Sequence, residues 1–164
     1  MYKYPVRNKD EYVIFFWQGR NSSVNEKGTS AYLTVDLSDS ISGVQVRVVQ
    51  NKEPKQFLDI FGGKIIVHHS KRIHDHLSAA LYQVCENDTG VHIVQVENDC
   101  LCLNSNHTFI VITPEQVILW YGSGSSEKEK QVSKSTVEHE TIVGERSIVE
   151  IEEGSKRVGK GLIL

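Results

Sequence analysis

An internal repeat constrains the fold of this chain more than any other feature of its sequence. Two aromatic segments, at 13–19 and 117–122, each end in Trp-x-Gly. Counted from Trp17 and Trp120, which lie 103 residues apart, a glycine, two serines, a glutamate and a lysine recur at the same positions. They are Gly19, Ser22, Ser23, Glu26 and Lys27 in the first copy, and Gly122, Ser125, Ser126, Glu129 and Lys130 in the second. Two copies of one domain are the simplest explanation.

Each copy reads as an apolar strand, a polar loop, a helix and a further β-rich stretch. Ser23 with Glu26, and Ser126 with Glu129, fit the capping box that starts a helix. We expect the first helix to bury an apolar stripe from 31–35 and to end near Ser42 and Gly43. The second, around 131–141, has few apolar and several β-branched residues, which predicts a short or frayed helix.

The two copies differ in completeness. The second has an additional leading segment at 80–84 and a further alternating strand at 92–96. The sequence therefore predicts a partial repeat at 1–69, a linker at 70–78 and a fuller repeat at 79–164. In the first repeat we expect one sheet edge to lack its partner strand.

Composition excludes several classes of function. The net charge of −3 is mixed along the chain, which argues against nucleic-acid binding. No apolar stretch reaches the ~18 residues of a transmembrane helix. Three cysteines are too few for a disulfide scaffold and favour a cytoplasmic protein. The alternative of a secreted glycoprotein rests on glycosylation-type triplets at Asn21, Asn87 and Asn106.

Longer motifs in the correct order resemble those of the gelsolin and villin superfamily. The segments 17–20, 48–54 and 57–64 look like the back half of the fourth repeat in that family, and 80–84, 103–106 and 119–126 look like most of the fifth. The segments 26–31 and 34–37 lean towards supervillin, and the chain departs from the pattern from about residue 156. The resemblance implies an α+β fold, in which each repeat is a mixed β-sheet between one long and one short helix.

The same resemblance implies a cytoskeletal protein that binds actin filaments, with capping, severing or bundling under calcium control. It places calcium ligands at Glu26 in the first copy, and at Glu129 and the carbonyl of Asn106 in the second. Both sites are incomplete, because His107 occupies the expected acidic position and the acidic partner of Glu26 would precede Met1. The alternative role of Glu26 and Glu129 is helix capping alone.

For actin contact we expect the exposed face of the first long helix, with Lys27, Ser30 and Thr34 as candidates. The alternative is a scaffold or interaction module that kept the fold and lost actin and calcium binding.

Other chemistry has weaker sequence support. No catalytic motif is present, so we predict no enzyme. A phosphoinositide site would use Lys64, His68, Lys71 and Arg72. A zinc site would draw on His68, His69, His74, His76, Cys100, Cys102 and His107, whose spacing fits no standard finger. Cys100 and Cys102 are expected to be buried on a strand instead.

Overall fold

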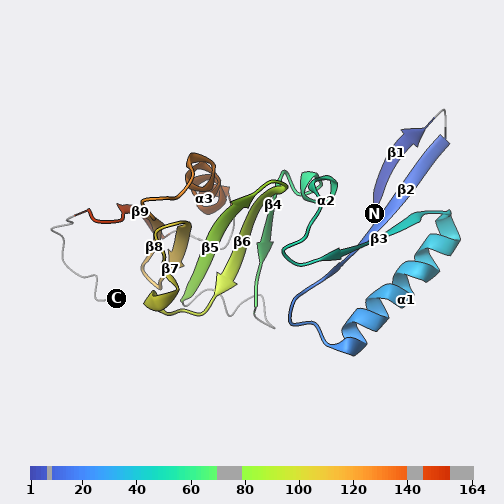
Figure 1. The fold of residues 1–164 in the computed structure, drawn as a ribbon, viewed down its shortest axis with the longest axis horizontal. Coiled ribbons are helices and arrows are strands. Elements are labelled where there is room, and N and C mark those ends of the chain that lie inside the picture. The colour runs from blue at the N-terminus through green and yellow to red at the C-terminus, as the bar shows by residue number, and fades with distance from the viewer. Residues whose placement is uncertain (7–8, 70–78, 140–145, 156–164) are drawn as a thin grey trace. The chain divides into compact units, whose positions relative to one another are not determined.

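The computed structural model describes residues 1–6, 9–69, 79–139 and 146–155, shown in Figure 1. The chain divides into two compact units, Met1–Gly63 and Lys64–Leu164. Each unit combines a mixed β-sheet with helices, which confirms the predicted α+β class. Among the described residues, no helix combines the length and the apolar character needed to cross a membrane.

The first unit is a three-stranded sheet with two helices. Its elements are β1 (Tyr2–Val6), β2 (Lys9–Gln18), α1 (Val24–Ile41), β3 (Val44–Val49) and α2 (Lys55–Asp59). The strand order is β1-β2-β3, with β1 antiparallel and β3 parallel to the central β2.

The two helices of this unit contact side chains that alternate along β2. Gln18 Nε2 donates a hydrogen bond to the Lys27 carbonyl of α1 at 3.2 Å. Phe15 packs edge-on against Phe57 of α2, with ring centroids 5.5 Å apart. Because odd and even positions of a strand point to opposite faces, α1 and α2 cover opposite sides of the sheet. This is the predicted arrangement of one long and one short helix around a sheet.

Helix α1 is rotated relative to the sequence prediction. Its buried residues are Thr34 and Ser38. Their hydroxyls donate to helix carbonyls, at 2.7 Å to Ser30 and 2.9 Å to Val35, so burial leaves no unpaired polar group. Large apolar residues of the helix are exposed instead: Tyr32 by 72%, Leu33 by 59%, Val35 by 44% and Leu37 by 42%. The predicted apolar core stripe is therefore wrong.

The second unit is built on a larger sheet. Its elements are β4 (Lys64–Val67), β5 (Ala80–Asn87), β6 (Gly90–Val96), the 3-10 helix η2 (Cys100–Cys102), β7 (Thr108–Ile112), β8 (Gln116–Tyr121), α3 (Glu127–His139) and β9 (Ser147–Glu152). The strand order is β4-β6-β5-β7-β8-β9.

The sheet of the second unit is buried on both faces. One face packs Tyr82, Ile93 and Leu119 with Val137 of α3, and the other packs Phe109 and residues of the η2 segment. Helix α3 runs for 13 residues, so the prediction of a short or frayed helix is wrong. Its serine hydroxyls donate to carbonyls one turn earlier, which lets a helix with few apolar residues lie against the sheet.

The boundary between the units differs from the sequence expectation. Strand β4 pairs in parallel with β6 of the second unit, whereas the sequence places residues 64–69 in the first repeat. Ile66 packs against the core of the second unit, and Lys64 Nζ donates to Thr136 Oγ1 at 3.1 Å. The expected linker, 70–78, and the divergent tail from 156 lie outside the described residues.

The sequence repeat has a counterpart in strand register. Val13 lies opposite Val44 in the β2–β3 pair, and Gln116 lies opposite Ser147 in the β8–β9 pair. Gln116 follows Val13 by 103 residues, and Ser147 follows Val44 by 103 residues, which is the separation of Trp17 and Trp120.

The turns after these strands also match. Asn51 and Gly154 both have a positive φ, of 67° and 77°. Asparagine and glycine are the residues that most readily adopt this conformation, which explains how one replaces the other at this position.

Candidate functional site

The first of the two predicted helix-start glutamates acts as a cap. Glu26 Oε2 accepts hydrogen bonds from the Ser23 N–H at 2.7 Å and the Ser23 hydroxyl at 2.8 Å. In return, the Glu26 N–H donates to Ser23 Oγ at 3.2 Å. The predicted capping box is therefore present at the exposed start of α1.

Glu129 makes the equivalent contacts in the second unit and has further partners. Its N–H donates to Ser126 Oγ at 3.1 Å, and its Oε2 accepts from the Ser126 N–H at 3.4 Å. The side chain is only 4% exposed. Its other oxygen, Oε1, accepts the Glu86 N–H at 2.9 Å and lies 3.2 Å from His107 Nδ1. Glu129 thus belongs both to the helix cap and to a cluster of side chains that includes His107.

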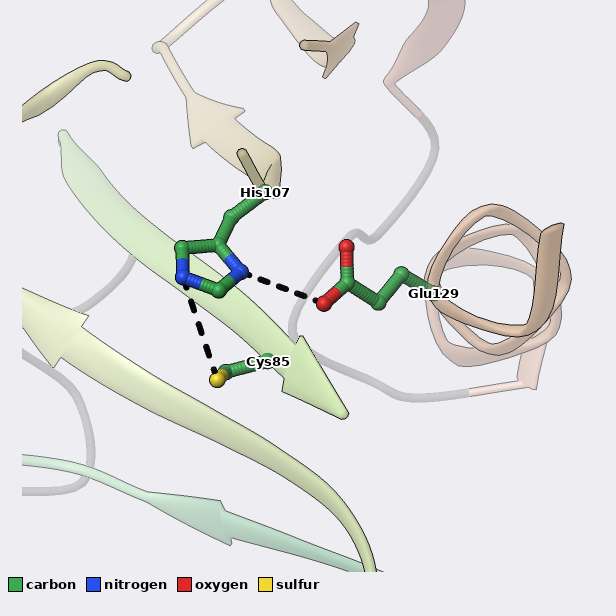
Figure 2. Close-up of side chains that lie close together, drawn as sticks. All are labelled: Cys85, His107 and Glu129. Carbon is green, nitrogen blue, oxygen red and sulfur yellow. Dashed lines mark hydrogen bonds and ion pairs between the residues drawn. The ribbon is translucent and has the colours of Figure 1, made fainter. Parts of the chain in front are cut away.

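That cluster consists of Cys85, His107 and Glu129 (Figure 2). His107 lies between the other two, with Nδ1 directed at Glu129 and Nε2 at 4.0 Å from the Cys85 sulfur. The three side chains come from β5, the residue before β7 and the first turn of α3. Cys85 is the member that the sequence did not single out. It lies just beyond the predicted segment 80–84, and only the pairing of β5 with β7 brings it beside His107.

The electrostatics of the cluster favour a neutral thiol. Burial raises the pKa of Cys85, and the nearby Glu129 carboxylate raises it further. A thiol that keeps its proton is a weak nucleophile. By contrast, hydrogen bonds from Ser126 and Lys128 lower the pKa of the neighbouring Glu86 carboxyl. The arrangement therefore resembles a catalytic Cys-His-Glu relay in connectivity without activating the sulfur.

A close backbone contact positions the loop that carries His107. The Gly122 N–H donates to the His107 carbonyl at 3.1 Å, and the Gly124 N–H donates to the Ser105 carbonyl at 2.7 Å. A Cβ atom on Gly122 would lie 2.4 Å from the Ser105 carbonyl oxygen and 2.8 Å from that of His107. Glycine at 122 is thus required for the loop to approach β8 this closely.

Glu153, just after β9, holds the same loop from another side. Its carboxylate accepts the Ser105 hydroxyl at 2.7 Å and the Ser123 N–H at 2.8 Å. These hydrogen bonds lower the pKa of Glu153 below its ordinary value of 4.5. A carboxyl with a lowered folded-state pKa stabilises the fold above its ordinary pKa, and this contribution is lost as the pH falls through the folded-state pKa.

We therefore expect Glu153→Gln to reduce the acid sensitivity of the second unit. The melting temperature of the wild-type protein should fall more steeply than that of the variant as the pH drops below about 4.5. Circular dichroism melts between pH 3 and 6 measure this, with the exposed Glu138→Gln as control. Parallel pH profiles for wild type and Glu153→Gln would contradict the role of Glu153.

The donor set at this position does not fit calcium. Calcium prefers six to eight oxygen ligands, whereas the cluster offers one carboxylate, an imidazole and a thiol. Asn106, the expected carbonyl ligand, is exposed, and its N–H donates to Asn104 Oδ1 at 3.1 Å.

Two of the three predicted actin-contact residues, Ser30 and Thr34, lie towards the sheet rather than on the exposed face of α1, and the third, Lys27, is half-buried. Thr34 is only 5% exposed. Ser30 Oγ donates to the Lys27 carbonyl at 2.8 Å and accepts from Gln18 Nε2 at 3.3 Å, on the side facing β2. The prediction that Ser30 and Thr34 lie on the exposed face is therefore wrong. The reason is that small hydroxyl residues of α1, rather than apolar ones, face the sheet.

Among the described residues, the histidines and cysteines of the zinc hypothesis do not assemble into one cluster. Cys100 is exposed in η2, so its predicted burial on a strand is wrong. Within the described residues, His107 is grouped with Cys85 rather than with Cys100 or Cys102. His74 and His76 lie outside the described residues.

The basic residues of the phosphoinositide hypothesis are only partly described. Lys64 contacts Thr136, as noted for β4, and His68 Nδ1 lies 2.9 Å from the Tyr82 hydroxyl. Lys71 and Arg72 lie outside the described residues.

Comparison with known proteins agrees with the architecture. Residues 8–58 match the family model of the gelsolin repeat. The chain is 44% identical to villidin of Dictyostelium discoideum over 143 residues, covering 85% of this chain and 8% of villidin. It is 36% identical to cytoplasmic gelsolin of Homarus americanus, covering 94% of this chain and 22% of that protein. It is also 36% identical to mouse advillin, and this match covers 84% of this chain and 18% of advillin.

These matches extend over most of the chain and include both units. The chain belongs to the gelsolin and villin superfamily. It spans less than a quarter of the length of each of these three relatives.

Proposed function

We propose that this chain binds actin filaments as part of a cytoplasmic protein of the gelsolin and villin superfamily. The proposal rests on the family membership and on one structural observation. Four large apolar side chains in the middle of α1 are more than 40% exposed instead of being buried against the sheet that the helix covers. We call Tyr32, Leu33, Val35 and Leu37 the α1 apolar surface.

This surface has the chemistry of a protein interface. Four large apolar side chains, each more than 40% exposed, lie within six residues of one helix. Leu33 and Leu37 are one helical turn apart and therefore adjacent. Burying a leucine side chain against a partner stabilises the complex by about 1.5–3 kcal/mol. Exposed apolar side chains on a helix are a recurrent means of protein recognition.

The test is filament binding by a variant that changes only this surface. Because Leu33 and Leu37 are exposed, Leu33→Asp/Leu37→Asp should leave the fold intact and weaken co-sedimentation with actin filaments at least ~10-fold. The matched control is Leu101→Asp, which replaces an 86% exposed leucine in the other unit. Circular dichroism verifies folding of each variant.

Three outcomes would oppose the proposal. Unchanged binding by the double variant would remove α1 as the contact, and equal losses in Leu101→Asp would indicate a nonspecific effect. If the folded wild-type chain does not bind filaments at all, the alternative of an interaction module that lost actin binding takes its place. His107 offers an imidazole nitrogen where a calcium site needs an oxygen ligand. This argues against the calcium control that the family resemblance implies. Filament length by fluorescence microscopy then distinguishes severing, capping and bundling.

A further inference from the structure

We propose that Cys85, His107 and Glu129 form a binding site for a borderline divalent transition metal, with Zn²⁺ as the best-matched ion. This inference concerns the second unit and is independent of the actin proposal. Each residue offers one ligand atom, and these atoms lie within 4.8 Å of one another.

The fold explains why the three donors converge. Strands β5 and β7 pair antiparallel with Val84 opposite Thr108. The next residue along β5 is Cys85 and the residue preceding β7 is His107, so the register brings them beside each other. Glu129 reaches the same region from the first turn of α3, and Figure 2 shows His107 lying between Cys85 and Glu129.

The distances suit a small ion with tetrahedral coordination. Zinc bonds of about 2.0–2.3 Å to N, O and S imply separations of ~3.5 Å between neighbouring ligand atoms. The observed separations are 3.2 Å from His107 Nδ1 to Glu129 Oε1 and 4.0 Å from His107 Nε2 to the Cys85 sulfur, so these two contacts use opposite ring nitrogens. One ligand atom from each residue lies within 4.8 Å of the other two. A rotation of the imidazole that turns one nitrogen towards both partners completes the protein ligand set. Three protein ligands leave the fourth position for water.

The type of donor distinguishes the ion. Thiolate and imidazole are preferred by zinc and its neighbours, whereas calcium takes oxygen. The Cys85 thiol, which is neutral without metal, releases its proton to solvent when the ion binds. Cys85 and His107 supply the sulfur and nitrogen donors of the cluster, and Glu129 supplies the oxygen donor.

Surrounding contacts hold the ligands in place while leaving a route for the ion. Glu129 is fixed by Ser126 and by the Glu86 N–H, and the His107 backbone is fixed by the Gly122 N–H. Such outer contacts orient metal ligands. The His107 side chain is 27% exposed and supplies access from solvent.

The test uses Co²⁺ as an optical probe of the full chain after treatment with chelator. We expect one equivalent of Co²⁺ to give a sulfur-to-cobalt charge-transfer band, which stoichiometric Zn²⁺ removes and excess Ca²⁺ does not. Cys85→Ser should abolish the band, and His107→Gln should weaken metal binding by at least ~100-fold.

The control variants are Cys100→Ser, Cys102→Ser and the exposed His139→Ala, which should retain the band. Circular dichroism shows whether each variant folds. A charge-transfer band that persists in folded Cys85→Ser, or its absence from the folded wild-type protein, would overturn the proposal. Because His107→Gln keeps the thiol, its result also separates three-ligand binding from binding by a cysteine alone.

Discussion

Replacing Gly122 with alanine is expected to destabilise the second unit by about 3 kcal/mol. The added Cβ would lie 2.4 Å from the Ser105 carbonyl oxygen, a separation that requires the backbone to move. Overpacking of a rigid site commonly costs ~1–3 kcal/mol, and here the neighbour is backbone rather than a flexible side chain. Amide hydrogen exchange in β7 and β8 should accelerate roughly a hundredfold.

The equivalent glycine in the first unit provides the control. A Cβ on Gly19 would lie 3.2 Å from Ser22 Oγ and 3.3 Å from the Trp17 ring, both side-chain atoms. We therefore expect Gly19→Ala to cost less than ~1 kcal/mol. Equal acceleration of exchange in the two variants, each measured in its own unit, would contradict the close contact described for Gly122.

Replacing Glu129 with alanine is also expected to cost about 3 kcal/mol. The change removes the acceptor of the Glu86 N–H and half of the helix cap. An unpaired buried N–H costs ~1–3 kcal/mol, and loss of a cap costs ~1 kcal/mol. Hydrogen exchange in the first turns of α3 should accelerate most, because both lost interactions fix the start of that helix.

Glu26→Ala is the matched control for Glu129→Ala. Both glutamates cap a helix at the same place in the repeat, but the contacts of Glu26 with Ser23 are exposed to solvent. Its replacement should cost ~1 kcal/mol. If both variants lose the same stability, the additional contact of Glu129 with the Glu86 N–H contributes little.

The sequence predicts much of the backbone organisation. The offset of 103 residues between Trp17 and Trp120 reappears in the strand registers of both copies. Ser23 and Glu26 mark the start of α1 correctly, and Gly43 follows its end. These features depend on interactions between residues near in the chain, or on a repeat that can be counted directly.

The orientation of α1 could not be predicted from apolar periodicity. That method assumes that apolar side chains face the core. In this helix, serine and threonine hydroxyls bond to carbonyls of their own helix, so Thr34 and Ser38 are buried with their hydrogen bonds satisfied. The same mechanism accounts for the length of α3, which carries buried Ser133 and Thr136. The buried face of a hydroxyl-rich helix therefore cannot be predicted without knowing its tertiary contacts.

The Cys85 cluster is a consequence of topology. Its members lie 22 residues apart along the chain in each successive step, and no local motif connects them. The leading segment at 80–84 contained a useful signal, because it forms part of β5, whose pairing with β7 brings Cys85 beside His107. Which strand pairs with which, however, depends on the order of all the strands in the sheet, and local sequence patterns do not give that order.

Co-sedimentation of the wild-type chain with actin filaments, in calcium and in chelator, tests whether this chain binds actin. We expect saturable pelleting with filaments that is the same in both conditions, because the proposed contact is the α1 apolar surface and the donors at 85, 107 and 129 do not suit calcium. A folded chain that stays in the supernatant in both conditions would contradict actin binding, and pelleting only with calcium would contradict calcium-independent binding.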